Sequence, residues 1–210
     1  FVIMLAFFSV VNAFGMVPPV FELLEWFSSI GFTNEFMPLF IIFFTGAILL
    51  PILLSLSAAK LSQIMTKTAK HISLRDTVAT FAPAFVPLAL GIWIAHYGFH
   101  FLIAPLSFIP IFQEFFGATQ GNWATYGIQL DQNIIGLIQL IALLGGFMWS
   151  MVIAMQAATR VYGQRASFGG LMPWALMLLL LMIAAYQVFA LPMEMRGTDD
   201  IFALLMAVIM

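Results

Sequence analysis

The chain has 210 residues, of which 63% are hydrophobic and 8% are charged, and its formal net charge is −2. An average soluble protein is about 45–50% apolar and ~25% charged, so this composition excludes a soluble globular domain and a polar, disordered chain. It also excludes a nucleic-acid-binding protein, which needs a basic face to neutralise phosphates. We therefore expect an all-α integral membrane protein whose first partner is the lipid bilayer.

We expect a bundle of five membrane-spanning helices, because about 20 helical residues cross a hydrocarbon core of about 30 Å. A sixth apolar run begins at Ile201 and reaches Met210. The chain starts at Phe1 inside an apolar run, so we expect residues 1–210 to form a single transmembrane domain that is a piece of a longer protein. The five expected spans are Phe1–Val17, Phe36–Ala59, Thr77–Ala104, Ile134–Ala158 and Leu171–Leu191.

Local signals support these boundaries. Ser73 and Asp76 have the spacing of a capping box just before the third span. Pro51, Pro83 and Pro87 fall inside apolar runs, where a missing amide proton bends a helix. Neighbouring helices in a bundle can satisfy the backbone groups that such bends release.

The basic residues predict the orientation. Six of the seven Lys and Arg residues lie in two loops, 60–75 and 160–165, which helix alternation places on one side. By the positive-inside rule that side is cytoplasmic, which predicts a multi-pass membrane protein with both basic loops inside. The opposite side carries most of the carboxylates, which are Glu22, Glu25, Glu35, Glu114, Asp131, Glu194, Asp199 and Asp200.

The outer side also carries irregular sequence. Residues Val20–Phe32 place apolar side chains at helical spacing, as in a short helix that lies in the membrane interface. Residues Pro105–Phe116 are a second such segment. The loop that follows contains Trp123 and Tyr126, which suit the level of the lipid headgroups.

His96 and His100 are the clearest candidates for chemistry. They are four residues apart near the outer end of the third span, so they share one helix face. Such a pair can bind a metal ion or a quinone headgroup, or supply one axial ligand to a haem. It cannot supply both axial ligands, because these approach a haem from opposite faces, and His71 is expected on the other side of the membrane.

Several other interpretations remain open. Glu114 and Asp131 are on the same side and could join the histidines, or both histidines could simply be bonded to loop carbonyls or water. Glu194 and Arg196, after the fifth span, are weaker binding candidates, because residue chemistry alone favours a solvated turn there. The polar residues within the spans and Gly145-Gly146 favour interhelical hydrogen bonds and close helix packing.

The stretches LAFFSVVNAFGMVPPVFELLEW, SLRDTVATFAPAFVPLALGIWIAHYGFHFLIAP and ALPMEMRGT resemble the membrane portion of bacterial 4Fe–4S-binding, polyferredoxin-type proteins related to those of nitrous oxide respiration. The resemblance implies electron transfer at the membrane, with a cysteine-rich ferredoxin-type domain on the cytoplasmic side. It marks His96, His100, Glu194 and Arg196 as motif positions, together with Asn12, Gly15, Pro19 and Pro192. The chain departs from the family in having no cysteine, so any iron–sulfur clusters must be held upstream or in trans.

Two functions follow from these patterns. The first is a membrane electron-transfer module that links cytoplasmic ferredoxin-type clusters to a quinone or a periplasmic redox partner. The second is a structural subunit, without a cofactor, that anchors a larger respiratory or photosynthetic complex. A stand-alone enzyme is disfavoured, because no nucleophile elbow, phosphate loop or zinc motif occurs.

Overall fold

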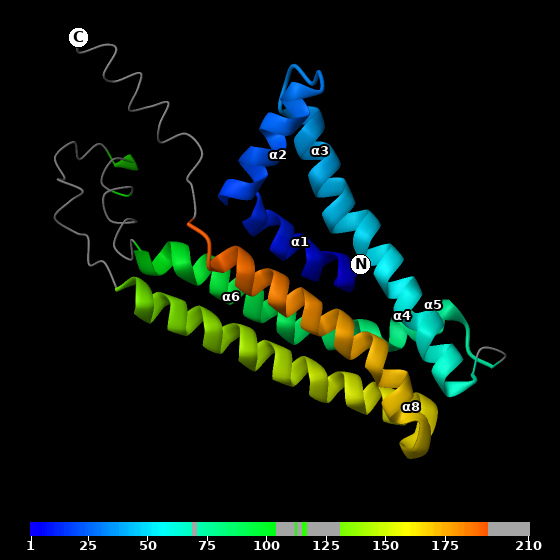
Figure 1. The fold of residues 1–210 in the computed structure, drawn as a ribbon. Coiled ribbons are helices and arrows are strands. Elements are labelled where there is room, and N and C mark those ends of the chain that lie inside the picture. The colour runs from blue at the N-terminus through cyan, green and yellow to red at the C-terminus, as the bar shows by residue number, and fades with distance from the viewer. Residues whose placement is uncertain (69–70, 104–111, 113–114, 117–130, 193–210) are drawn as a thin grey trace, which may run out of the picture.

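The computed structural model describes residues 1–68, 71–103, 112, 115–116 and 131–192, and their regular structure is entirely helical (Figure 1). The expected all-α architecture is thereby confirmed for these residues. The expected sixth run, the loop with Trp123 and Tyr126 and most of the segment 105–116 lie outside them. The helices are α1 (Val2–Phe14), α2 (Pro18–Ser29), α3 (Phe36–Phe44), α4 (Leu50–Thr66), α5 (Leu74–Phe81), α6 (Phe85–Ile103) and α8 (Gln132–Phe189).

Three helical stretches are long and apolar enough to cross a membrane, namely Phe36–Thr66, Leu74–Leu102 and Asn133–Phe189. The third is a hairpin, because α8 turns back on itself at Gly163 and its two arms run antiparallel (Figure 1). Gly163 has φ 72° and ψ 166°, which no helical residue adopts. The two arms contain the fourth and fifth expected spans.

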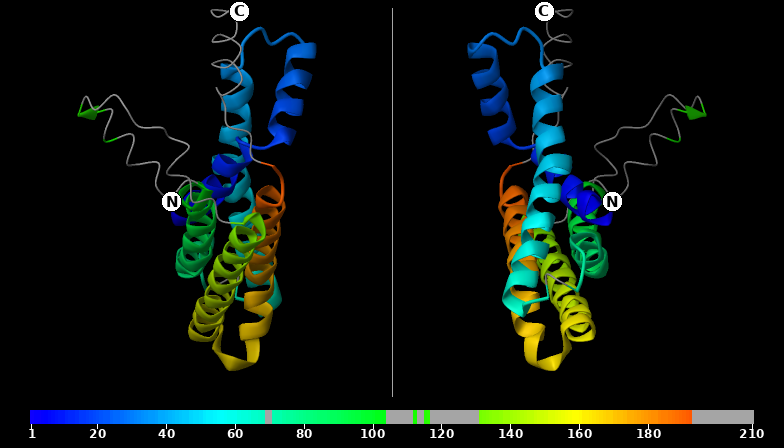
Figure 2. Two further views of the ribbon diagram at one scale, coloured as in Figure 1. Left: turned by 90° about the vertical axis from the view of Figure 1, so that its left-hand side faces the viewer. Right: turned by 90° about the vertical axis from the view of Figure 1, so that its right-hand side faces the viewer.

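The first expected span is shorter than a bilayer requires. Helix α1 has 13 residues and meets α2 at an angle of 82°, and only together do the two helices pass as a broken span or a re-entrant segment. The break falls at Pro18, whose fixed φ suits the first position of a new helix. Helix α2 corresponds to the short helix expected over Val20–Phe32, and it stands beside α3 (Figures 1 and 2).

Two of the three expected proline bends, at Pro51 and Pro83, coincide with irregular helix, whereas Pro87 lies in the first turn of α6. Just before Pro51, the π-helix η1 (Thr45–Leu49) connects α3 to α4. Pro83 lies in the 3₁₀ turn η2 (Ala82–Ala84) between α5 and α6. The α6 amide of Leu88 donates to Ser150 Oγ of α8 over 3.0 Å, so a neighbouring helix satisfies a backbone group near this break.

The expected helix start at Ser73 is confirmed, with one of the two backbone bonds of a capping box. Ser73 is the N-cap of α5, and its Oγ accepts from the amide of Asp76 over 3.1 Å. The same hydroxyl donates to the Asp76 carboxylate over 2.6 Å. The helical stretch consequently starts at Leu74, three residues before the expected third span.

The core forms where α6 packs along both arms of α8. Two glycines allow the close approach: a Cβ atom at Gly146 would lie 2.7 Å from the Pro87 carbonyl oxygen, and Gly91 faces the Ala142 carbonyl in the same way. Nearer to the hairpin turn, the rings of Phe81 and Trp174 stack with centroids 4.8 Å apart and planes 5° apart. Both side chains are fully buried, which fixes the second arm of α8 against α5 and α6.

The two basic loops lie at one end of the molecule, as helix alternation predicts. Ser62 Oγ in α4 donates to the Gly170 carbonyl of α8 over 2.8 Å. This bond joins the end of α4 to the hairpin of α8, so residues 60–75 and 160–165 are neighbours in space (Figure 1).

The long helix from α3 to α4 lies at the periphery. Only 17% of its most apolar 18-residue window is buried, against 39% for each of the other two stretches. Phe40, Leu53 and Ile64 are more than half exposed. A large apolar surface of this kind is compatible with contact with lipid.

Candidate functional site

The histidine pair lies near the outer end of α6, and its two rings are adjacent as the four-residue spacing predicts. Their centroids are 4.9 Å apart and their planes are nearly perpendicular, at 89°. His96 is 3% exposed, whereas His100 is half-buried. The pair therefore consists of one enclosed ring and one ring nearer to the surface.

Side chains from α1 and from both arms of α8 lie at or beside His96. Asn12 of α1 places its amide nitrogen 3.5 Å from Nε2 of the imidazole. Phe189, at the end of α8, stacks on the ring with a centroid distance of 6.2 Å and an interplanar angle of 19°. Gln139 of the first α8 arm donates to the carbonyl of the neighbouring residue Ala95 over 3.1 Å. Helices α1, α6 and the second arm of α8 thus meet at this imidazole, and the first arm is bonded next to it.

The second nitrogen of the same imidazole lacks a partner. Nδ1 of His96 is buried and has no hydrogen bond to any described residue. Leaving a buried polar atom unpaired costs about 1–3 kcal/mol, and each such atom in a native structure calls for an explanation, such as a catalytic role or a bound water or ion. This nitrogen is the main reason to treat the pair as a site rather than as packing.

The residues fit a metal ion poorly. Among the described residues, no group of three or more His, Cys, Asp or Glu side chains is placed to hold a metal ion. Asp131, which sequence reasoning grouped with the histidines, accepts from the Asn133 amide over 2.8 Å and caps α8. Glu114 lies outside the described residues. Two imidazoles alone leave most of a coordination sphere to other ligands.

Iron–sulfur clusters do not fit this chain, because it has no cysteine to supply thiolates. A haem with one axial histidine is compatible with an enclosed ring that is held on several sides. A quinone needs hydrogen-bonding groups beside an apolar wall, and the structure offers such a place next to His96.

A cavity of about 400 Å³ opens between the two arms of α8. It is lined by the polar side chains of Asn133, Gln139 and Tyr186 and by the ring of Phe189, among apolar neighbours. Phe189 also stacks on His96, and Gln139 bonds to the adjacent residue Ala95, so one side chain of the cavity contacts the histidine directly. Its size and its mixture of apolar surface with a few polar groups are those of a small-molecule site.

Sequence reasoning did not find this cavity. Gln139 and Tyr186 were interpreted as residues that bond between helices, which is confirmed for Gln139. The cavity exists because the hairpin at Gly163 brings together residues that are far apart in the sequence. The only local signal was the presence of polar side chains inside apolar spans.

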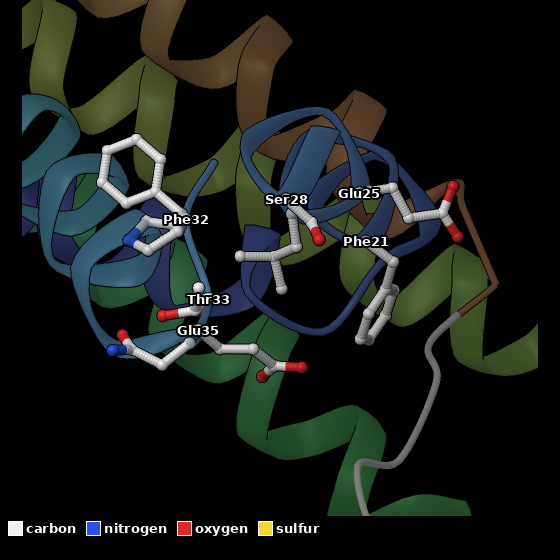
Figure 3. Close-up of a pocket in the computed structure, with 9 residues that line it drawn as sticks. Phe21, Glu25, Ser28, Phe32, Thr33 and Glu35 are labelled. Atoms are coloured by element: carbon white, nitrogen blue, oxygen red, sulfur yellow. The ribbon is translucent and has the colours of Figure 1, made fainter. Parts of the chain in front are cut away.

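A second cavity of about 310 Å³ lies where α2 joins α3 (Figure 3). Its lining includes Glu25 and Glu35 together with Ser28, Thr33 and Asn34. Two carboxylates do not by themselves define a metal site, and neither histidine of the pair lines this cavity.

Glu194 and Arg196, the weaker candidates, lie outside the described residues, so the structure does not test their role. Comparison of the chain with protein-family models, with curated proteins and with solved structures found no match. Fold and site thus define a class only: an all-helical protein with apolar helices long enough to cross a membrane, and a histidine pair where three of its helices meet.

Proposed function

We propose that this chain is a membrane electron-transfer module. It has five spans in a bacterial inner membrane, with the basic loops 60–75 and 160–165 on the cytoplasmic side. It links ferredoxin-type clusters, held upstream or in trans, to a quinone or a periplasmic redox partner at the His96 and His100 rim. The buried Nδ1 of His96, which has no hydrogen-bond partner among the described residues, is the observation that supports this proposal most directly.

The residues have distinct roles in this proposal. Phe189 provides an apolar wall for a planar ring, and Gln139 and Tyr186 provide hydrogen-bonding groups at the edge of the cavity. His96 lies behind the Phe189 ring, and His100 extends the imidazole pair toward the surface. Reduction of a quinone by the ferredoxin-type clusters takes up two electrons and two protons, so a site for it needs groups that can donate protons to the quinone. Imidazoles at the outer rim are suited to that task.

Purified full-length protein and its histidine variants test the proposal. We expect a bound quinone or haem in the wild type, detected by extraction or by absorbance. His96→Gln and the double variant His96→Ala/His100→Ala should lower electron transfer at least tenfold while the amount of assembled protein stays unchanged. His71→Ala, which changes the exposed third histidine at the basic end, is the matched control and should have no effect.

The alternative is an anchor subunit without a cofactor. The exposed apolar surface from α3 to α4 favours it, because a partner subunit could cover that face as readily as lipid. Under this alternative the purified chain holds no haem, metal or quinone, and the double histidine variant changes assembly or nothing at all. Either result would overturn the electron-transfer proposal.

A further inference from the structure

An apolar groove of about 600 Å³ lies at the basic end of the molecule, between α1, α4 and α5. We call it the inner groove. Met4 of α1, Ile52 and Leu56 of α4, and Val78 and Ala79 of α5 are among the residues that line it. It is far from the histidine pair, because α5 and α6 carry the chain from the groove to the opposite end of the bundle (Figure 1).

Among the described residues that line the inner groove, Arg75 has the one charged side chain. Its side chain is exposed and makes no ion pair within the described part of the chain. The hydroxyl of Ser55 also lines the groove, but it already donates to the Pro51 carbonyl over 2.6 Å. The groove therefore offers a long apolar surface and a single unpaired cation.

The surroundings of Arg75 add to its positive charge. Lys60 on α4, Lys67 just after it, and Arg160 and Arg165 at the α8 hairpin are exposed at the same end of the molecule. Asp76, the carboxylate beside Arg75 in sequence, is bonded to Ser73 over 2.6 Å and does not line the groove. An anion near Arg75 therefore meets a field that is mainly positive.

We propose that the inner groove binds one anionic phospholipid from the membrane leaflet at the basic end. The phosphate lies at Arg75, and one acyl chain runs along Ile52, Leu56, Val78 and Ala79. Basic pockets between membrane helices on the cytoplasmic side are a recognised way of holding anionic headgroups, and the cavity is of the size of small-molecule sites. This lipid site is separate from the histidine pair, so the proposal for it does not depend on the electron-transfer proposal.

Photolabelling tests the proposal with full-length protein in nanodiscs of phosphatidylcholine that contain a phosphatidylglycerol with a photoreactive acyl chain. We expect covalent label on peptides that contain residues 52–56 and 78–82. Arg75→Gln should lower this labelling about fivefold, which is the effect of losing one basic contact, and Arg75→Lys should restore it. Leu56→Trp, which narrows the groove, should also lower it, with the protein still monodisperse on gel filtration.

Two matched controls make the test specific. Lys60→Gln removes a charge at the same end, and Leu53→Trp adds the same bulk to α4, but neither residue lines the groove. If Lys60→Gln and Leu53→Trp lower the labelling as much as the groove variants do, the lipid is attracted by the basic face in general, and the proposal is overturned. Equal labelling by a phosphatidylcholine probe with the same acyl chain would also overturn it. So would the absence of label from the groove because a peptide segment occupies it.

Discussion

Gly145 and Gly146 are adjacent in α8 but have very different surroundings. A Cβ atom at Gly146 would lie 2.7 Å from the Pro87 carbonyl oxygen and 3.1 Å from the Leu88 Cα, both in the backbone of α6. Because backbone cannot move aside as a side chain can, Gly146→Ala should force α6 and α8 apart and cost about 1–3 kcal/mol. Thermal unfolding in detergent should show the loss as a lower midpoint temperature.

Gly145→Ala is the control for that prediction. No heavy atom comes within 4 Å of a Cβ at Gly145, so the substitution should be neutral or stabilise the helix by up to about 1 kcal/mol. Equal destabilisation by both variants would contradict the packing seen here. The sequence predicted close helix packing at this pair, but it could not tell which glycine faces α6, since that depends on how α8 is rotated.

The histidine pair shows the same limit at the residue scale. The spacing of His96 and His100 predicted that they share a face, and their adjacent rings confirm it. The spacing could not predict Asn12 or Phe189 as neighbours, because these come from the two ends of the chain. The spacing along a helix shows which side chains share one face of it, but the packing of the whole chain determines which residues contact that face.

The α8 hairpin depends on one residue. Gly163 has φ 72° and ψ 166°, a combination that is essentially restricted to glycine. No atom crowds a Cβ there, so any cost of Gly163→Ala arises from the backbone alone. We expect a loss of about 1–3 kcal/mol in the free energy of unfolding, measured by denaturant titration in micelles.

If Gly163→Ala lowers the free energy of unfolding no more than Gly145→Ala does, the turn does not require a residue that adopts a positive φ easily. At this scale the sequence predicted two separate spans, and the structure joins them through a turn so tight that the helix is nearly continuous. The expected spans that end at Ala158 and begin at Leu171 are shorter than the two helical arms. Polar residues such as Arg160 and Gln164 end an apolar run, but they do not end a helix.

Across the whole molecule, the alternation of the helices was predicted better than their lengths. Hydropathy predicted five spans, but α1 is too short to cross alone and bends by 82° into α2. Helix alternation predicted that the basic loops 60–75 and 160–165 share one end, and the Ser62–Gly170 bond joins α4 to α8 at that end. Two loops lie at the same end whenever an even number of helices separates them. This prediction therefore does not depend on the exact length of each helix.

Which side of the membrane the basic end faces can be measured with single cysteines, since the chain has none of its own. The stretch Phe36–Thr66 has 31 residues, about 46 Å of helix at 1.5 Å per residue, which exceeds the ~30 Å hydrocarbon core. Asn34 and His71 flank this stretch, and both are exposed. In intact cells, Asn34→Cys should react with an impermeant maleimide. His71→Cys and Arg165→Cys should react only after the membrane is opened.

The outcomes separate two parts of the proposal. If all three cysteines react from outside, the stretch from α3 to α4 does not cross the membrane, and its exposed apolar face must be covered by something other than the bilayer core. If the pattern is reversed, the helices cross but the molecule is inverted. The histidine rim would then face the cytoplasm, and a ferredoxin-type donor at the basic end would be on the wrong side to deliver electrons.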